Sequence, residues 1–182
     1  MPPNPCRVIN NSCLFCLFKV QRRGTNIAML DLRIDTPNLS ATQALAKALA
    51  PALKAGDCLL LSGDLGAGKS AFSRAIIQSI AGADVEVPSP TYTLVQAYEL
   101  PTLRIFHYDL YRIGEPDEVY ELDWQEARHA GLCLVEWPSR LEHLTPSDAL
   151  NVSIRSVDEH ARHFYLTSTA PDWSARLTNS LK

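Results

Sequence analysis

The chain of 182 residues suits one domain with a sizeable core, since domains commonly contain about 100–150 residues. Hydrophobic residues make up 46% and charged residues 20%, a balance of soluble globular proteins that argues against disorder and against a membrane protein. The formal net charge is −3 and the 17 Lys and Arg residues are scattered, so we expect no direct, tight binding of RNA or DNA.

The first 28 residues differ in composition from the rest of the chain, and we expect residues 1–28 to be a disordered extension. Their apolar patch, Cys13 to Phe18, is shorter than the ~7–15 residues of a signal peptide, and no small-residue cleavage site comes after it. Met29 precedes the first strand-like and helix-like patterns, so the native chain is expected to start there.

The cysteine pattern fits a reducing cytoplasm. The five cysteines are odd in number and have no framework spacing, which is untypical of a secreted disulfide protein. Cys13 and Cys16 form a lone CxxC pair without the two further ligands of a zinc site, so no metal is expected there.

Residues 29–170 are predicted to form one α/β domain, with a C-terminal tail at 171–182. The apolar runs Cys58–Leu61 and Leu132–Val135 are typical of central parallel strands covered on both faces, and hairpin patterns predict antiparallel strands at one side of the sheet. The other expected strands are Leu30–Asp35, Tyr92–Tyr98, Leu103–Tyr108, Ala149–Arg155 and Arg162–Thr167. Three helices are expected. The first begins at a capping box formed by Ser40 and Gln43 and ends at about Ala50, and the other two span Lys69–Ala81 and Asp117–Ala130.

Residues 63–70, GDLGAGKS, match the phosphate-loop pattern G-x-x-x-x-G-K-[ST] at every fixed position, between a predicted strand and a predicted helix. The glycines let backbone N–H groups turn toward a phosphate, and the helix start adds a positive dipole end. We therefore predict a three-layer P-loop NTPase-like fold, in which Lys69 reaches the β- and γ-phosphates and Ser70 ligates Mg²⁺. The predicted nucleotide-binding residues are Gly63, Asp64, Leu65, Gly66, Ala67, Gly68, Lys69, Ser70 and Ala71.

A carboxylate at the end of a neighbouring strand would complete the metal site, and two candidates qualify. Glu136 follows the apolar run LCLV, as in sites where a buried strand delivers an acid to the metal, and Asp109 follows RIFHY. Both remain open, because a strand-end acid can also be a helix cap or a surface residue. For His107, packing within a strand is favoured over proton transfer, and Trp137 is open between stacking and core packing.

Four motifs in this order, GDLGAGKS, PSPTYTLV, HYDLYR and LVEWP, resemble the TsaE family, the ATPase of bacterial tRNA threonylcarbamoyladenosine biosynthesis. The resemblance is dense from about Asp35 to Leu141. It implies a cytoplasmic ATPase that supports a TsaB–TsaD pair in placing threonylcarbamoyl on the adenosine beside the anticodon of tRNAs that read ANN codons. TsaB-like and TsaD-like partners are implied in the same way, with tRNA reached only indirectly through the complex.

The resemblance also implies roles for single residues. Lys69 and Ser70 correspond to the phosphate and magnesium residues, and Glu136 to the second protein ligand of magnesium. Thr91 lies in the family's switch-like loop, and Asp109 is the acid of its DLYR motif. We therefore expect Lys69, Thr91, Asp109 and Glu136 to be catalytic, Ser70 and Glu136 to hold the metal, and ATP and Mg²⁺ to be the cofactors.

Other functions remain open. A P-loop small-molecule kinase usually carries an arginine-rich lid, and Arg104, Arg112 and Arg140 are too dispersed to indicate one. A GTPase would need an Asn-Lys-x-Asp motif, which the sequence lacks, and a non-hydrolysing scaffold would bind nucleotide without turnover. Because no arginine lies in a motif for an arginine finger, hydrolysis is expected to be slow until partners dock near Thr91 and Trp137.

Overall fold

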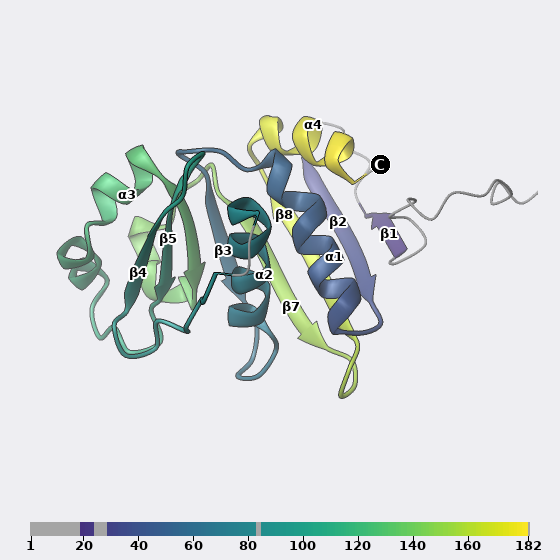
Figure 1. Cartoon of the computed structure of the whole chain (residues 1–182), viewed down its shortest axis with the longest axis horizontal. Coiled ribbons are helices and arrows are strands. Elements are labelled where there is room, and N and C mark those ends of the chain that lie inside the picture. Colours follow the sequence, from purple (N-terminus) through teal and green to yellow (C-terminus); the bar gives the residue numbers. More distant parts are fainter. Residues whose placement is uncertain (1–18, 24–28, 83–84, 182) are drawn as a thin grey trace, which may run out of the picture.

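The computed structural model describes residues 19–23, 29–82 and 85–181, and it contains a mixed sheet with helices on both faces (Figure 1). The strands are β1 (Lys19–Arg22), β2 (Leu30–Thr36), β3 (Cys58–Ser62), β4 (Val95–Glu99), β5 (Arg104–Asp109), β6 (Leu132–Glu136), β7 (Leu150–Ser156) and β8 (Arg162–Ser168). The helical segments are α1 (Leu39–Leu49), η2 (Ala50–Ala52), α2 (Lys69–Ala81), η3 (Pro116–Leu122), α3 (Trp124–Ala130), η4 (Pro138–Leu144) and α4 (Pro171–Ser180). Within these described ranges, no helix has the length and apolar character needed to cross a membrane.

The strand order across the sheet is β1-β2-β8-β7-β3-β6-β5-β4. The central strands β7, β3, β6 and β5 are parallel. Antiparallel strands flank them on both sides, with β4 beside β5 and with β8, β2 and β1 beyond β7. The predicted mixed α/β fold is confirmed, and the antiparallel pairing extends to a second side of the sheet.

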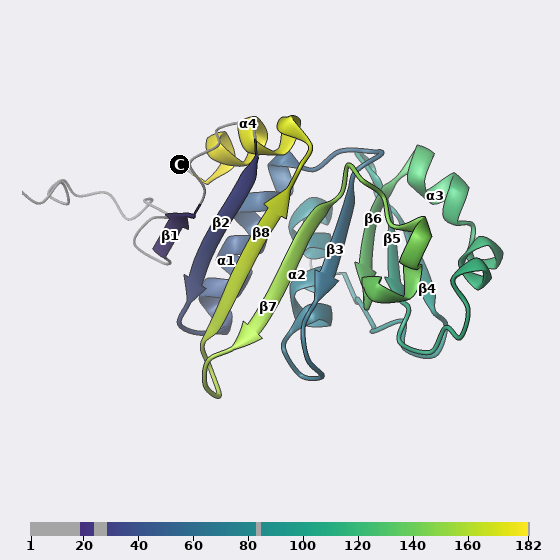
Figure 2. The same cartoon turned by 180° about the vertical axis from the view of Figure 1, so that it is seen from behind.

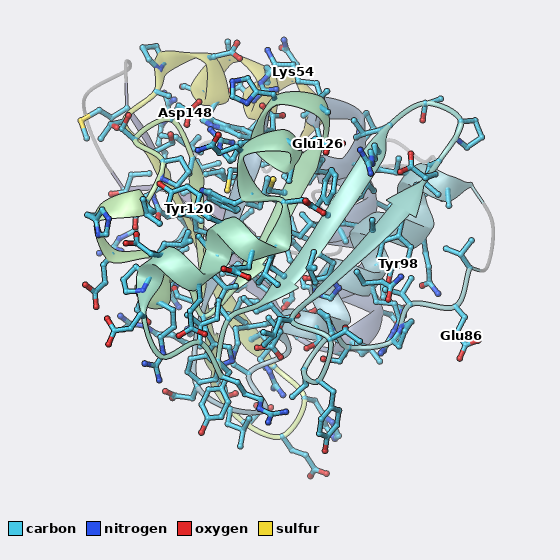
Figure 3. The ribbon with its side chains drawn as sticks, turned by 90° about the vertical axis from the view of Figure 1, so that its left-hand side faces the viewer. Lys54, Glu86, Tyr98, Tyr120, Glu126 and Asp148 are labelled. Atoms are coloured by element: carbon cyan, nitrogen blue, oxygen red, sulfur yellow. The ribbon has the colours of Figure 1, made fainter. Side chains whose placement is uncertain are left out.

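Two apolar cores lie on the two faces of the sheet, and β3 contributes to both. Leu59 and Leu61 belong to the core under α1 and α2, whereas Cys58 and Leu60 belong to the core under α3 and η4. Since successive side chains of a strand point to opposite faces, a strand covered on both faces reads as one apolar run. Viewed from the β4 edge, Glu126 of α3 marks the second layer of helices (Figure 3).

The start of α1 differs from the prediction. The N-cap is Asn38, whose side chain accepts a hydrogen bond from the backbone N–H of Ala41 at 2.9 Å. Ser40 already lies inside the helix, so the capping box predicted at Ser40 and Gln43 is wrong. Asn38 lies two positions earlier and is an equally good capping residue, which places its acceptor opposite the free N–H groups of the first turn.

Two elements are shorter than predicted because a residue adopts a left-handed backbone. Leu94 has φ 63°, so the segment that begins at Tyr92 is first a turn, and β4 starts only at Val95. Asp123 has φ 57° and divides the helix expected over 117–130 into η3 and α3. Left-handed conformations are uncommon outside glycine, although aspartate adopts them more readily than leucine does, so Asp123 carries a weak signal and Leu94 none.

Both ends of the described chain join the fold. The segment expected as a C-terminal tail contains α4, whose Trp173 and Leu177 are buried in the core under α1 and α2. β1 pairs with β2 in antiparallel orientation, although it lies in the predicted extension. The rest of that extension, with Cys13 and Cys16, lies outside the described residues, and the start at Met29 remains a prediction.

Candidate functional site

The phosphate loop joins β3 to α2, as the sequence predicts. Gly68 precedes the first residue of α2 in a left-handed conformation with φ 107°. Gly63 packs so closely on β7 that a Cβ atom there would lie 2.4 Å from the carbonyl oxygen of Ile154. Glycine is therefore required at Gly63 for close approach and favoured at Gly68 for the turn into the helix.

Lys69 is held over the loop by backbone oxygens and an aromatic ring. Its Nζ donates hydrogen bonds to the carbonyl oxygens of Gly63 at 2.8 Å and Asp64 at 2.9 Å, and it lies 4.0 Å from the ring centroid of Trp137. Burial lowers the pKa of Lys69 from its ordinary value, against the opposing effect of nearby carboxylates led by Glu136. This ammonium group has lost much of its water. An anion that binds beside it would therefore form a strong electrostatic contact with it.

Glu136 ends β6 with one hydrogen-bond partner on each carboxylate oxygen. Ser70 Oγ donates to Oε2 at 2.8 Å, and His107 Nε2 lies 2.7 Å from Oε1. Because an ionised carboxylate can only accept, Nε2 carries the proton in this contact. His107 is buried, as expected for a packed strand histidine, but it also orients Glu136. Ser70 and Glu136, the two predicted metal ligands, thus present adjacent hard oxygen donors.

Asp109 ends β5 directly beside Glu136 in the register of the parallel strands. Thr91 Oγ1 donates to Oδ2 of Asp109 at 2.9 Å, and the backbone N–H of Tyr111 donates to Oδ1 at 3.1 Å. Ser89 Oγ lies 2.9 Å from Thr91 Oγ1. The loop of residues 89–91 is therefore tied to the end of β5 through Asp109.

All four predicted catalytic residues line one cavity of about 290 Å³. It opens at the carboxyl ends of β3, β5 and β6, where parallel sheets commonly bind ligands. The lining residues are Leu65, Gly66, Gly68, Lys69, Ser70, Ala71, Thr91, Asp109, Tyr111, Glu136 and Trp137.

The donor set of this cavity fits magnesium rather than a metal held by protein alone. No group of three or more His, Cys, Asp or Glu side chains in the described ranges could hold an ion. Mg²⁺ usually takes one or two protein oxygens and completes its shell with phosphate oxygens and water. The hydroxyl of Ser70 and the carboxylate of Glu136 are such a pair.

Two aromatic residues line the cavity: Trp137, which the sequence left open between stacking and core packing, and Tyr111, which was not among the predicted site residues. The rings of Tyr111 and Trp137 lie 5.0 Å apart between centroids, and Trp137 is partly exposed rather than part of a core. Each aromatic residue follows a strand-end acid by one or two positions. That spacing is the signal from which Tyr111 could have been found.

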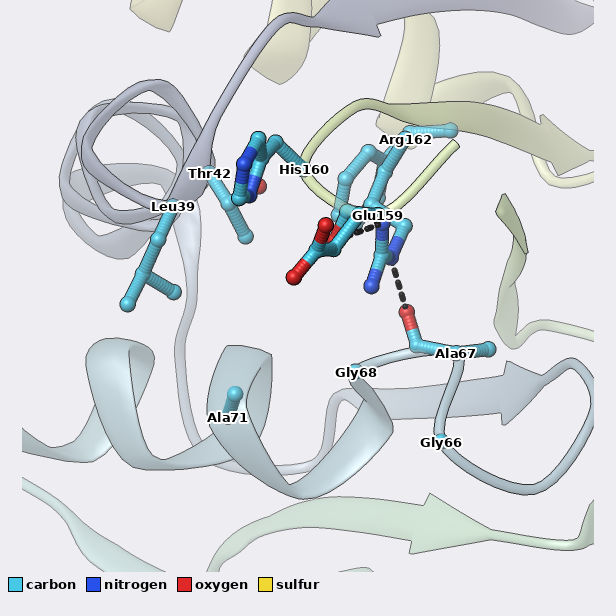
Figure 4. A pocket seen from close by; sticks show the side chains of 10 residues that line it. Leu39, Thr42, Gly66, Ala67, Gly68, Ala71, Glu159, His160 and Arg162 are labelled. Atoms are coloured by element: carbon cyan, nitrogen blue, oxygen red, sulfur yellow. Dashed lines mark hydrogen bonds between the residues drawn. The ribbon is translucent and has the colours of Figure 1, made fainter. Parts of the chain in front are cut away.

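A second cavity, of about 370 Å³, lies on the other side of the phosphate loop (Figure 4). It shares Gly66, Gly68 and Ala71 with the first cavity. Arg162 Nε donates to the carbonyl oxygen of Ala67 at 3.0 Å and so ties the turn between β7 and β8 to the loop. The remaining walls are Leu39, Thr42, Glu159, His160 and Phe164. No sequence motif indicates this role of Arg162.

Known proteins of one family are similar to this chain in sequence and in structure. The family model described as threonylcarbamoyl adenosine biosynthesis protein TsaE matches residues 36–164. A tRNA threonylcarbamoyladenosine biosynthesis protein TsaE from Rickettsia felis is 43% identical over 125 residues, which cover 69% of this chain and 73% of that protein. The Bacillus subtilis protein of the same name is 36% identical over 141 residues, covering 77% and 87%. A crystal structure of Bacillus subtilis YdiB matches with a TM-score of 0.67 and 30% identity, covering 84% of this chain and 95% of that one.

Proposed function

The chain belongs to the TsaE family of tRNA threonylcarbamoyladenosine biosynthesis, and from this premise we propose that it is a Mg²⁺-dependent ATPase of that process. The observation that carries the proposal is the convergence of Lys69, Ser70 and Glu136 in one cavity beside the phosphate loop. A cation, a hydroxyl and a carboxylate in this arrangement are the groups that P-loop enzymes use on a nucleotide phosphate chain.

The loop and Lys69 would bind the phosphates. Backbone N–H groups of the loop and the positive end of the α2 dipole favour negative charge at this point. Lys69 Nζ now contacts the carbonyl oxygens of Gly63 and Asp64, and phosphate oxygens would give it stronger, charge-assisted partners. The ring of Trp137 keeps the ammonium group at the cavity.

Ser70 and Glu136 would hold Mg²⁺. When bound, the ion supplies charge neutralisation on the β- and γ-phosphates. The oxygen of Glu136 that accepts from Ser70 would turn to the metal, while His107 keeps the other oxygen in place. His107 is in this proposal a positioning residue, because it acts through Glu136.

Asp109 and Thr91 would organise the side of the cavity where water attacks. Asp109 accepts from Thr91 and from the backbone of Tyr111, and each carboxylate oxygen can accept one further hydrogen bond. An attacking water could take such a position. Thr91 directly follows Pro90 in a short loop that also contains Pro88, so a nucleotide that competes for its hydroxyl would change the order of that loop.

The second cavity would take the nucleoside end of ATP. It borders the phosphate cavity at Gly66, Gly68 and Ala71, so a nucleotide whose phosphates lie in one cavity could extend into the other. Its apolar walls, such as Leu39 and Phe164, suit a base, and Glu159 and His160 offer polar groups at its rim.

We propose TsaB-like and TsaD-like proteins in the cytoplasm as the partners, with tRNA reached through their complex. Among the described residues, no arginine lines the phosphate cavity, so the charge that stabilises γ-phosphate transfer would come from a partner. The partners would dock near Thr91 and Trp137, which border this cavity.

Steady-state ATP turnover with and without the purified partner pair, at equal ATP and Mg²⁺, tests the proposal. We expect slow hydrolysis by the isolated chain and a marked acceleration by the pair, within the ~10³–10⁵-fold that an added arginine supplies. A fast isolated enzyme, or one indifferent to the pair, would contradict it. Phosphorylation of a nucleoside or sugar in the same assay would favour the small-molecule kinase instead.

A further inference from the structure

Within the described part of the chain, no helix covers one face of the sheet at the side formed by β1, β2, β8 and β7 (Figure 2). α1 and α2 pack on the opposite face, and the described helices on the near face cover β3, β5 and β6. The side chains that β2, β8 and β7 direct to this open face alternate with buried core residues, and none of them is aliphatic. The face is therefore a wide polar surface rather than an unfinished core.

Because of the strand register, cations from distant parts of the sequence lie together on this face. Lys19 and Arg23 come from β1 and the residue after it, Arg33 from β2, and Arg155 from β7. Among the described residues, this face carries four cations and two carboxylates, Asp31 and Asp35, although the formal net charge of the chain is −3. Basic residues are scattered along the sequence, and folding brings these four together.

Three arginines surround one ring at the centre of the face. The guanidinium carbons of Arg155, Arg23 and Arg33 lie 5.1, 5.4 and 6.0 Å from the ring centroid of Tyr165. Arg33 is anchored by a 2.8 Å hydrogen bond to Asp35. Arg23 and Arg155 are exposed and, among the described residues, form no ion pair. Like charges so close together repel each other, and an anion between them relieves that repulsion.

We propose that this face contacts the phosphate backbone of tRNA, an inference that rests on the proposed function in tRNA modification. Guanidinium groups bind phosphates through paired hydrogen bonds, and open sheets with an aromatic and basic surface are a recurring RNA-binding surface. Interfaces with nucleic acid are more polar and more positive than those between proteins, whose centres are apolar. The absence of aliphatic side chains from this face therefore favours RNA over a protein partner.

Residues 1–18 and 24–28, which lie outside the described residues, do not have the charge to bind this face. Residues 1–18 and 24–28 contain no Asp and no Glu, so they cannot supply the missing negative charge. The sequence predicts that tRNA is reached only through partner proteins. The proposed contact of this face with tRNA adds a direct interaction.

The test is fluorescence anisotropy of a labelled, unmodified tRNA transcript that reads an ANN codon, titrated with the full chain at several salt concentrations. We expect weak binding, with Kd on the order of 10⁻⁴–10⁻⁶ M, and a slope of log K against log salt of about −2 to −3 for three arginine contacts. The double variant Arg23→Gln/Arg155→Gln should reduce the slope by about two and weaken binding roughly tenfold. The variant Lys47→Gln/Lys54→Gln removes two exposed cations from other surfaces and should bind like the wild type.

Three results would overturn the inference. The wild type could fail to bind tRNA at low salt, or both double variants could lose affinity equally, which indicates a general charge effect. The arginine variant could also keep its tRNA affinity and lose binding to the TsaB-like and TsaD-like pair, which identifies a protein partner.

ATP turnover measured in parallel separates this inference from the proposed function. Normal turnover without tRNA binding overturns only the inference, and arginine-dependent tRNA binding without turnover overturns only the ATPase.

Discussion

The two ends of β3 and β6 bury ionisable groups in opposite ways. At the amino-terminal ends, Cys58 and Cys133 lie side by side in an apolar core, and burial raises the pKa of Cys133 to about 12. At the carboxyl ends, Lys69 and Glu136 are also buried, but each has hydrogen-bond partners aimed at it. Burial alone keeps a group neutral and inert, whereas burial with oriented partners holds a charge ready for a ligand.

The amino-terminal ends of β3 and β6, here called the core end, should determine the stability of the fold. Leu59→Ala is the sharpest test of this expectation. Leu59 follows Cys58 in β3 and is fully buried on the opposite face of the sheet, under α1 and α2, so its truncation should lower the free energy of unfolding by about 2–5 kcal/mol. ATP affinity of the folded protein should be unchanged. Val157→Ala, at an exposed position, is the matched control with an effect near zero in urea unfolding. A loss below about 1 kcal/mol for Leu59→Ala would mean that this end is loosely packed.

The carboxyl ends of β3 and β6, here called the site end, should determine nucleotide binding, and changes there should alter the stability of the fold little. Lys69→Ala removes a charge-assisted phosphate contact, and ATP affinity measured by calorimetry should fall by about 10–100-fold or more. The unfolding transition should stay close to that of the wild type, because Lys69 contributes little apolar volume to either core. Lys47→Ala, on the exposed side of α1, serves as the control. Unchanged ATP affinity in Lys69→Ala would remove the basis of the phosphate-loop interpretation.

The two ends should also respond oppositely to alkaline pH. The unfolded chain loses thiol protons above about pH 8.5 while folded Cys133 keeps its proton, so the free energy of unfolding falls with pH, by up to ~1.4 kcal/mol per pH unit. Lys69 has a lowered pKa, so the folded state releases that proton first and gains stability as pH rises toward about 10.4. Urea unfolding between about pH 8 and pH 10 should show a flatter fall for Cys133→Ala and a steeper one for Lys69→Ala. Parallel curves for all three proteins would contradict this assignment.

Local signals explain why much of the site end could be predicted from the sequence. The bounds of α2 were predicted correctly, because Gly68 and Gly82 both adopt left-handed conformations just outside it. The phosphate loop needs only a strand before it and a helix after it, and both are encoded within a few residues. Glu136 could be proposed because a buried parallel strand carries its own apolar signature.

Contacts between distant segments could not be predicted, because they depend on strand order and register. His107 reaches Glu136 only because β5 and β6 are neighbours, and Arg162 reaches Ala67 across 95 positions of the sequence. The arginines around Tyr165 come from β2, from β7 and from the residue after β1, and they show no pattern along the chain. The Asn38 cap was missed for a different reason, since two suitable capping residues lie close together and only the backbone decides between them.

The most direct test of the proposed ATPase is the affinity of the chain for ATP, measured with Mg²⁺ and again with EDTA, in the wild type and in Glu136→Gln. The amide of glutamine keeps the size of the side chain and removes its charge. The wild type should bind ATP more tightly with Mg²⁺ than with EDTA, and this difference should disappear in Glu136→Gln while binding in EDTA persists. A wild type whose ATP affinity is the same with and without Mg²⁺ would contradict the proposal, and a Mg²⁺ effect that survives in Glu136→Gln would assign the metal to Asp109.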